Sequence, residues 1–152
     1  MTGPIFDTHA HYSAHAFDAD RFALLDSLPA KGVVGVCEQA THSGDAPHVL
    51  ELAHRYPWVV AAIGIHPESL LAPEDCGADG PAPTVSVYGG DWAAEMRALA
   101  PYYDDPKVVA VGECGLDYHW PVPKDAQLAL FEAEIRLALS RRPSGLRKTR
   151  VS

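Results

Sequence analysis

Four short apolar runs alternate with segments of helical periodicity along most of the chain. The runs begin near residues 5, 32, 59 and 107, and the helical segments cover about 21–28, 47–56, 92–100 and 126–139. The runs are continuously apolar, which is typical of strands covered on both faces. A β-α order repeated four times with buried strands predicts an α/β fold with a parallel sheet.

The helical segments carry their own start signals and buried faces. Asp20 and Asp91 stand where an N-cap residue is expected. In the last segment, Leu128, Phe131, Ile135 and Leu139 are spaced to line one face, which we expect to be buried. Residues 38–45 are predicted to be a polar loop, and residues 68–90, rich in Pro, Gly and Asp, a long elaborated loop.

Polar residues stand at the end of every predicted strand. His9 and His11 end the first strand, Glu38-Gln39 the second, His66 the third and Glu113 the fourth. Side chains alternate along a strand, so His9 and His11 leave the same face. The carboxyl ends of parallel strands are where α/β proteins place ligands and chemistry.

Two imidazoles and one carboxylate, with an open position for water, form a recurrent catalytic zinc set. Such an ion would polarise an ester or phosphoryl oxygen and make a nucleophile of its bound water. Each residue taken singly also has an ordinary interpretation: His66 could be a loop histidine, Glu113 a helix-capping or surface acid, and Asp117 a turn former.

Composition narrows the class of protein. The chain of 152 residues is 47% apolar and 21% charged, as in globular proteins that fold around one core. A net charge of −8 argues against nucleic-acid binding through a basic surface. Three cysteines without a Cys-x-x-Cys pair favour a reducing compartment, and neither a signal peptide nor a membrane span is recognisable, so we expect a cytoplasmic protein.

Three stretches of the sequence resemble the TatD-like metal-dependent deoxyribonucleases, a branch of the amidohydrolase-like TIM barrels. They are residues 6–11, Phe-Asp-Thr-His-Ala-His; residues 64–67, Gly-Ile-His-Pro; and residues 111–118, Val-Gly-Glu-Cys-Gly-Leu-Asp-Tyr. Gln127 and Phe131 match as well. The motifs occur in the family's order, and the third is specific.

The resemblance implies a role for each candidate residue. His9, His11 and Glu113 would be metal ligands, with Glu113 bridging two divalent ions of zinc, manganese or magnesium. His66 would face the phosphate of a DNA substrate, and Asp117 would lie close to the same pocket. These two would be the catalytic residues of the metal-activated hydrolysis.

The chain also departs from the family. The family's barrel has eight strands and about 250 residues, so the resemblance implies that residues 1–140 form the N-terminal half, about four βα units, of a TIM-type (β/α)8 barrel. Two further metal-binding histidines and a catalytic aspartate of the family have no counterpart, since no histidine follows His119 and no aspartate follows Asp125. Residues 141–152 hold five Lys/Arg and no acid, and we expect a basic tail that is out of frame or disordered.

Three functional hypotheses follow. The first is a DNase domain that cuts phosphodiester bonds, impaired in a truncated chain. The second is a non-catalytic half barrel that binds metal or a partner without turnover, and whose open sheet edges favour self-association. The third is another amidohydrolase-like hydrolase, acting on amides or lactones, which fits residues 112–117 less well.

Overall fold

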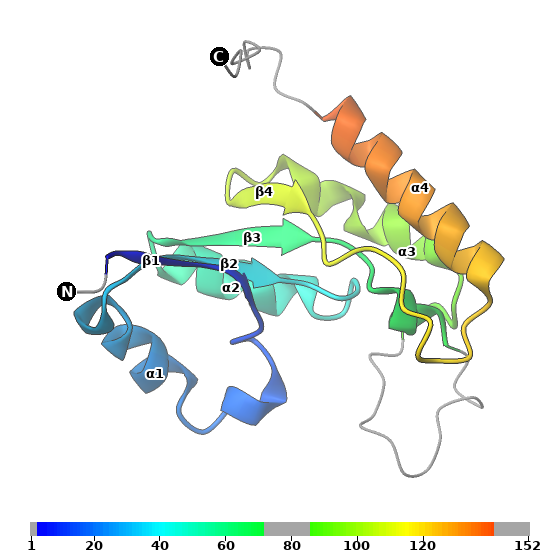
Figure 1. The fold of residues 1–152 in the computed structure, drawn as a ribbon. Coiled ribbons are helices and arrows are strands. Elements are labelled where there is room, and N and C mark those ends of the chain that lie inside the picture. The colour runs from blue at the N-terminus through cyan, green and yellow to red at the C-terminus, as the bar shows by residue number, and fades with distance from the viewer. Residues whose placement is uncertain (1–2, 72–85, 142–152) are drawn as a thin grey trace.

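A computed structural model describes residues 3–71 and 86–141 (Figure 1). Its centre is one sheet of four parallel strands in the order β1-β2-β3-β4. The strands are β1 (Ile5–Ala10), β2 (Val33–Gln39), β3 (Val59–Ile63) and β4 (Val108–Val111). The predicted parallel α/β fold is confirmed.

Helices follow the strands in the predicted alternation (Figure 1). The α-helices are α1 (Arg21–Ser27), α2 (Ala46–Arg55), α3 (Trp92–Leu99) and α4 (Lys124–Ser140). Short 3-10 helices add η1 (His15–Phe17), η2 (Pro29–Lys31), η3 (Pro67–Leu70) and η5 (Ala100–Asp104). Helix α2 packs on β2 and β3, and α4 packs against β4 and η3.

The core lies between the two inner strands and α2. Val36 of β2, Ile63 of β3 and Val49 of α2 are fully buried members of one apolar cluster. Burial on both faces is confirmed for most of β2 and β3, but it is wrong for the outer strands. Phe6 of β1 is 53% exposed and Val109 of β4 is 59% exposed, because strand side chains stand on the sheet faces and no described element covers these two.

The buried face of α4 differs from the predicted one. Leu128, Ile135 and Leu139 are all exposed. The residues that α4 buries are instead Gln127, Leu130 and Glu134. The helix is therefore oriented by one leucine and two polar side chains whose hydrogen-bond partners lie in the loops at the strand ends.

Two other sequence expectations changed in detail. Strand β2 continues through Glu38 and Gln39, which were predicted to begin a loop, and both are buried. Of the two predicted N-caps, Asp91 accepts a hydrogen bond from the Ala94 amide, whereas Asp20 makes no such side-chain bond. Most of the predicted long loop, and the predicted tail beyond Arg141, lie outside the described residues.

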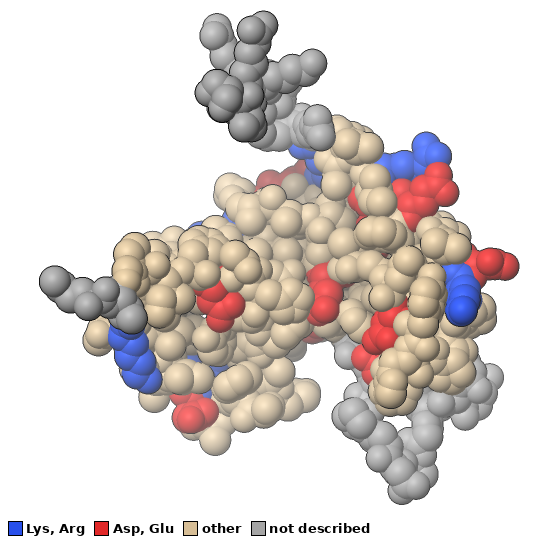
Figure 2. Space-filling view, viewed as in Figure 1, with Lys and Arg blue, Asp and Glu red and all other residues tan. Residues whose placement is uncertain are grey.

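The surface and the cysteines agree with the composition. Figure 2 shows scattered acidic side chains on the visible face, where the described residues form no continuous basic patch. Cys37 and Cys114 are free thiols, and the cytoplasmic location stays a prediction. No helix within residues 3–71 and 86–141 is both long and apolar enough to cross a membrane.

Candidate metal centre

The last residues of β1 and the loop after it present two imidazoles to the same space. His9 and His11 are two positions apart, and their rings meet edge to face with centroids 5.0 Å apart. Their Nε2 atoms are 3.1 Å from each other. The carboxylate of Asp7 accepts a hydrogen bond from the His9 amide, which fixes the backbone at this strand end.

Glu113 reaches the same point from the far edge of the sheet. Its amide donates to the Ala40 carbonyl after β2, so the segment that follows β4 turns back over the inner strands. The Glu113 backbone packs directly on Gly64, because Gly64 has no side chain. A Cβ there would lie 2.6 Å from the Glu113 carbonyl oxygen. Glu113 Oε2 lies 3.5 Å from His9 Nε2 and 3.2 Å from His11 Nε2.

The three side chains fit a single divalent cation. Each offers one ligand atom, and these atoms all lie within 4.8 Å of one another. Donors held about 2.1 Å from a tetrahedral zinc ion lie about 3.4 Å apart, and the three separations here run from 3.1 to 3.5 Å. Two Nε2 atoms and a carboxylate so close together, on partly exposed side chains, form a donor set suited to zinc or manganese.

The electrostatics of the cluster follow from this closeness. A hydrogen bond to Glu113 raises the pKa of His11, although partial burial opposes the rise. The same hydrogen bond holds the pKa of Glu113 below its usual range, helped by the charges of His66 and His9. The carboxylate is therefore ionised at neutral pH, and its negative charge favours the binding of a cation beside it.

His66 lies on the other side of the Glu113 carboxylate. Its Nε2 is 3.7 Å from Glu113 Oε1, while its Nδ1 accepts a hydrogen bond from the Glu68 amide at 3.2 Å. An Nδ1 that accepts leaves the proton of a neutral ring on Nε2. The ring therefore presents an N–H donor at the site, and the two oxygens of Glu113 face different histidines.

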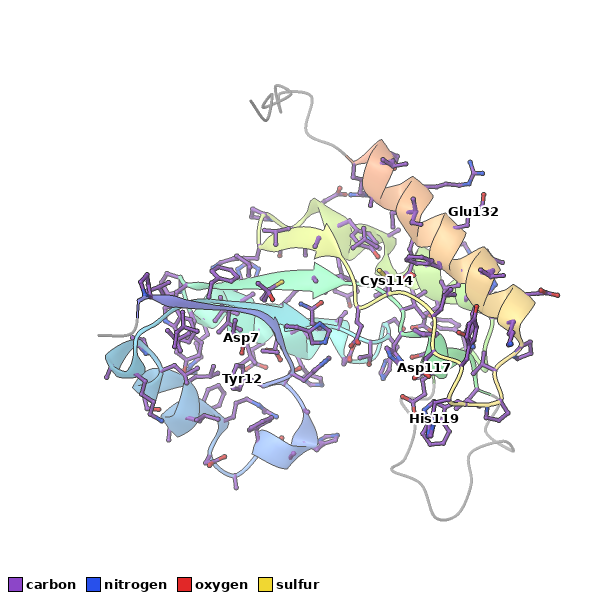
Figure 3. All side chains as sticks on the ribbon, viewed as in Figure 1. Asp7, Tyr12, Cys114, Asp117, His119 and Glu132 are labelled. Carbon is purple, nitrogen blue, oxygen red and sulfur yellow. The ribbon has the colours of Figure 1, made fainter. Side chains whose placement is uncertain are left out.

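Asp117 is not brought into this cluster. It lies on the loop between β4 and α4, with Cys114 and His119 before and after it (Figure 3). Its Oδ1 accepts from the His119 amide at 2.8 Å, as in a turn. Among the described residues, the candidate ligand group contains His9, His11 and Glu113 but not Asp117.

Three buried polar residues support the loops around the site, and the sequence analysis assigned none of them this role. Gln127 accepts from the Asp117 amide and donates to the Asp117 and Val122 carbonyls, so it fixes the loop before α4. Glu134 accepts from the Ile65 amide at 2.8 Å, next to His66. Glu38, expected near the site from its place at a strand end, is buried, accepts a hydrogen bond from the Ser13 amide, and lies close enough for its charge to act on His11. For Gln127 and Glu134, the sequence signal was their helical spacing with Leu130, which places the three residues on one face of α4.

Burial governs the other ionisable groups near the site. Desolvation raises the pKa of Glu134 to about 8 and that of the Cys114 thiol to about 11. The Cys114 thiol is therefore protonated at neutral pH, which makes it a poor nucleophile and a poor metal ligand.

Comparison with known proteins places this arrangement in a family. A family model described as TatD related DNase matches residues 6–142. The uncharacterized metal-dependent hydrolase YabD of Bacillus subtilis is 32% identical over 137 residues, which are 88% of this chain and 46% of YabD. Human deoxyribonuclease TATDN3 is 32% identical over 115 residues, 75% of this chain and 38% of that protein.

A solved structure shows the same architecture. The crystal structure of YjjV, a TatD homologue from Escherichia coli, superposes with a TM-score of 0.69 at 28% identity, covering 88% of this chain and 46% of YjjV. The chain thus spans just under half the length of these relatives, and its four βα units correspond to half of a TIM-type barrel. By sequence and fold, the chain belongs to the family of TatD related DNases.

Proposed function

We propose that this chain carries part of the active site of a metal-dependent hydrolase that cleaves phosphodiester bonds of DNA. The observation that supports it most is the convergence of His9, His11 and Glu113, whose donor atoms all lie within 4.8 Å of one another. The relatives named metal-dependent hydrolase and deoxyribonuclease support the metal and the substrate.

In this proposal the roles of the side chains follow from their positions. A bound divalent ion would supply Lewis acidity and a water of lowered pKa. His9 and His11 hold the ion through Nε2, and Glu113 Oε2 completes the set. His66 directs an Nε2–H toward the same space, where it donates a hydrogen bond to a phosphate oxygen of the substrate.

The number and kind of metal ions are also proposals. Glu113 Oε2 faces His9 and His11, while Oε1 faces His66. The two carboxylate oxygens therefore face different histidines, and Glu113 would be the residue that shares a second ion, as in two-metal hydrolases. Two imidazoles favour zinc or manganese, and magnesium would require mostly oxygen ligands. Asp117 stays a proposed catalytic residue beside the same pocket, because its charge reaches Glu68, the neighbour of His66.

A second candidate function is metal binding without turnover. It is favoured by the composition of the cluster, because among the described residues only His9, His11 and Glu113 come together as candidate ligands. Under this candidate the three donors hold an ion without turnover of a substrate.

One experiment separates the candidates. The purified 152-residue chain is loaded with zinc or manganese, dialysed and analysed for metal by mass spectrometry. A His9→Ala/Glu113→Ala variant is analysed beside a His54→Ala/Glu132→Ala control, whose changes lie outside the cluster. Each sample is then assayed on single-stranded DNA.

The outcomes are distinct. We expect about one tightly held ion per chain, lost in the His9/Glu113 variant and kept in the control. DNA cleavage that disappears with the ion would support the hydrolase, and bound metal without cleavage would support the second candidate. Equal metal in the chain and in the cluster variant would refute both.

A further inference from the structure

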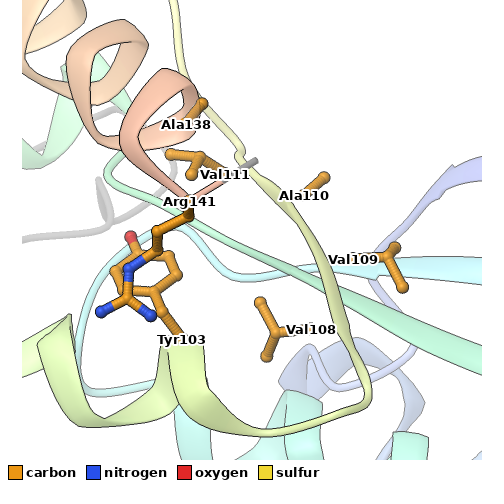
Figure 4. A pocket seen from close by; sticks show the side chains of 7 residues that line it. All are labelled: Tyr103, Val108, Val109, Ala110, Val111, Ala138 and Arg141. Carbon is orange, nitrogen blue, oxygen red and sulfur yellow. The ribbon is translucent and has the colours of Figure 1, made fainter. Parts of the chain in front are cut away.

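A groove of about 490 Å³ lies along β4, at the other edge of the sheet from β1 (Figure 4). The described residues that line it are Val108–Val111, Tyr103, Ala138 and Arg141, and they offer no carboxylate, imidazole or thiol to a ligand. The charged group among them, Arg141, is engaged by Asp104. The polar contacts that bear on metal binding lie instead behind the loop after β1.

This loop begins at a proposed ligand, because His11 follows the last residue of β1. The loop forms a turn on His11, whose carbonyl accepts a hydrogen bond from the Ala14 amide at 3.1 Å. Movement of the turn therefore moves the backbone that carries the imidazole. The contacts of residues 12–14 decide how precisely the His11 side chain is placed.

Arg21 of α1 holds the carbonyl groups of this loop. Its Nε donates to the Tyr12 carbonyl at 2.6 Å, and its Nη2 donates to the Ser13 and Ala14 carbonyls at 2.8 and 2.9 Å. The same Nη2 donates to the Asp18 carboxylate, which balances the charge of the guanidinium. One planar group, protonated at any physiological pH, thus binds three consecutive carbonyls.

Glu38 of β2 holds an amide of the same loop. Its Oε1 accepts a hydrogen bond from the Ser13 amide at 2.6 Å, and the residue is fully buried. Its Oε2 is also buried and has no hydrogen-bond partner among the described residues. A glutamate is rarely buried in this way, and the unpaired oxygen destabilises the fold. The fold therefore keeps a destabilising group at this position, which points to a role of the loop beyond stability.

Glu38 is also close to the ligands through the sheet. Ala10, the residue before His11, pairs with Glu38 across β1 and β2. The distance is short enough for the charge of Glu38 to act on His11. Neither Glu38 nor Arg21 belongs to the candidate ligand group of the described residues. Both side chains therefore act on the cluster through the loop.

We propose that Glu38 and Arg21 are positioning residues of the candidate metal centre. They hold the turn after β1 so that His11 Nε2 stays 3.1 Å from His9 Nε2 and 3.2 Å from Glu113 Oε2. Supporting contacts of this kind keep the ligands of a metal site in the geometry that the ion requires. The inference rests on the metal binding in the proposed function and does not require turnover.

The test separates metal affinity from stability. Zinc affinity of the purified 152-residue chain is measured by competition with a chromogenic chelator, and the free energy of unfolding by urea titration of the metal-free chain. Glu38→Ala and Arg21→Gln should each weaken zinc binding roughly 10–100-fold. Glu38→Gln keeps an oxygen that can accept from the Ser13 amide, and it should restore most of the affinity.

Glu95→Ala is the matched control. Glu95 is as fully buried as Glu38 and also accepts a hydrogen bond from a loop amide, that of Ser43, but it lies outside the candidate ligand group. The control should lose stability and keep the zinc affinity of the folded chain. A merely structural role would give Glu38→Ala the same result as Glu95→Ala.

Arg21→Gln decides the test if Glu38→Ala does not fold. The side chain of Arg21 is 19% exposed, so its replacement leaves no sealed cavity. In the metal-free variant, exchange of the Ala14 amide should be faster, because the turn on His11 is looser. In a His11→Ala background, Arg21→Gln should have no further effect on zinc affinity, because it acts through His11.

Two failures are distinguishable. A parent chain that binds zinc, with the same affinity in folded Arg21→Gln, would overturn the inference and leave the metal site intact. An equal loss of affinity in the His11→Ala background would overturn it as well. A parent chain that binds no zinc would refute the proposed metal site, and the inference with it.

Discussion

The most informative perturbation of the fold is Glu134→Gln in α4. Glu134 is almost fully buried, and its Oε1 accepts a hydrogen bond from the Ile65 amide, next to His66. Its other oxygen is buried and has no hydrogen-bond partner among the described residues. An ionised carboxylate in this position is costly, and burial raises its pKa from 4.5 to about 8.

The sign of the pH effect follows from this shift. Below pH 4.5 the group is protonated in both the folded and unfolded chain, so it contributes nothing to pH dependence. Between that pH and about 8, the unfolded chain loses the proton while the folded chain retains it. The free energy of unfolding therefore falls as pH rises, by roughly 3 kcal/mol between about pH 5 and pH 8.

Glutamine removes the titration but keeps a carbonyl oxygen for the Ile65 amide. We expect Glu134→Gln to lose this pH-dependent decline and to be more stable than the parent chain at alkaline pH. Urea unfolding across this pH range, followed by circular dichroism at one protein concentration, measures the effect. The control is Glu132→Gln, an exposed acid of the same helix paired with Arg136, which should keep the parent's slope.

The reasoning fails if Glu134→Gln and the parent chain show the same slope of unfolding free energy against pH. That result would mean that water or a relaxed backbone solvates the carboxylate. The turn that carries His66 would then be held by contacts other than the hydrogen bond from α4.

The remaining predictions concern the backbone beside the candidate metal centre. Gly64→Ala should destabilise the fold by roughly 2–3 kcal/mol and weaken metal binding, because its Cβ would press on the Glu113 carbonyl and displace that residue. Thermal unfolding and metal titration beside Gly3→Ala, where a Cβ meets nothing within 4 Å, would detect this, and unchanged metal affinity would contradict it. Gln127→Leu should cost roughly 2–4 kcal/mol and speed amide exchange at Asp117, whose amide and carbonyl it leaves unpaired. Exchange rates equal to those of the parent would show that Gln127 does not hold this loop.

Local sequence determined the element order of this protein. Continuous apolar runs and amphipathic segments report directly on burial, so the four strands, the four α-helices and the parallel sheet were predictable. The pairing of His9 with His11 was also local, because alternation along a strand and a spacing of two residues are enough to bring the side chains together. Glu113 was singled out by its place at the end of the fourth predicted strand and by the resemblance of residues 111–118.

Only the tertiary structure decided which polar groups meet. Glu113 reaches His9 and His11 because the segment after β4 crosses the inner strands against Gly64. Asp117, four residues later, lies outside this ligand group, and its carboxylate accepts from the His119 amide. Helix α4 buries two polar side chains and leaves three apolar ones exposed. The spacing of its apolar residues had predicted that the apolar face would be buried. The spacing of apolar residues along a helix indicates only which face gains most free energy from burial. The orientation of α4 also depends on the backbone amides and carbonyls at the strand ends, whose hydrogen-bond partners are fixed only when the chain is folded.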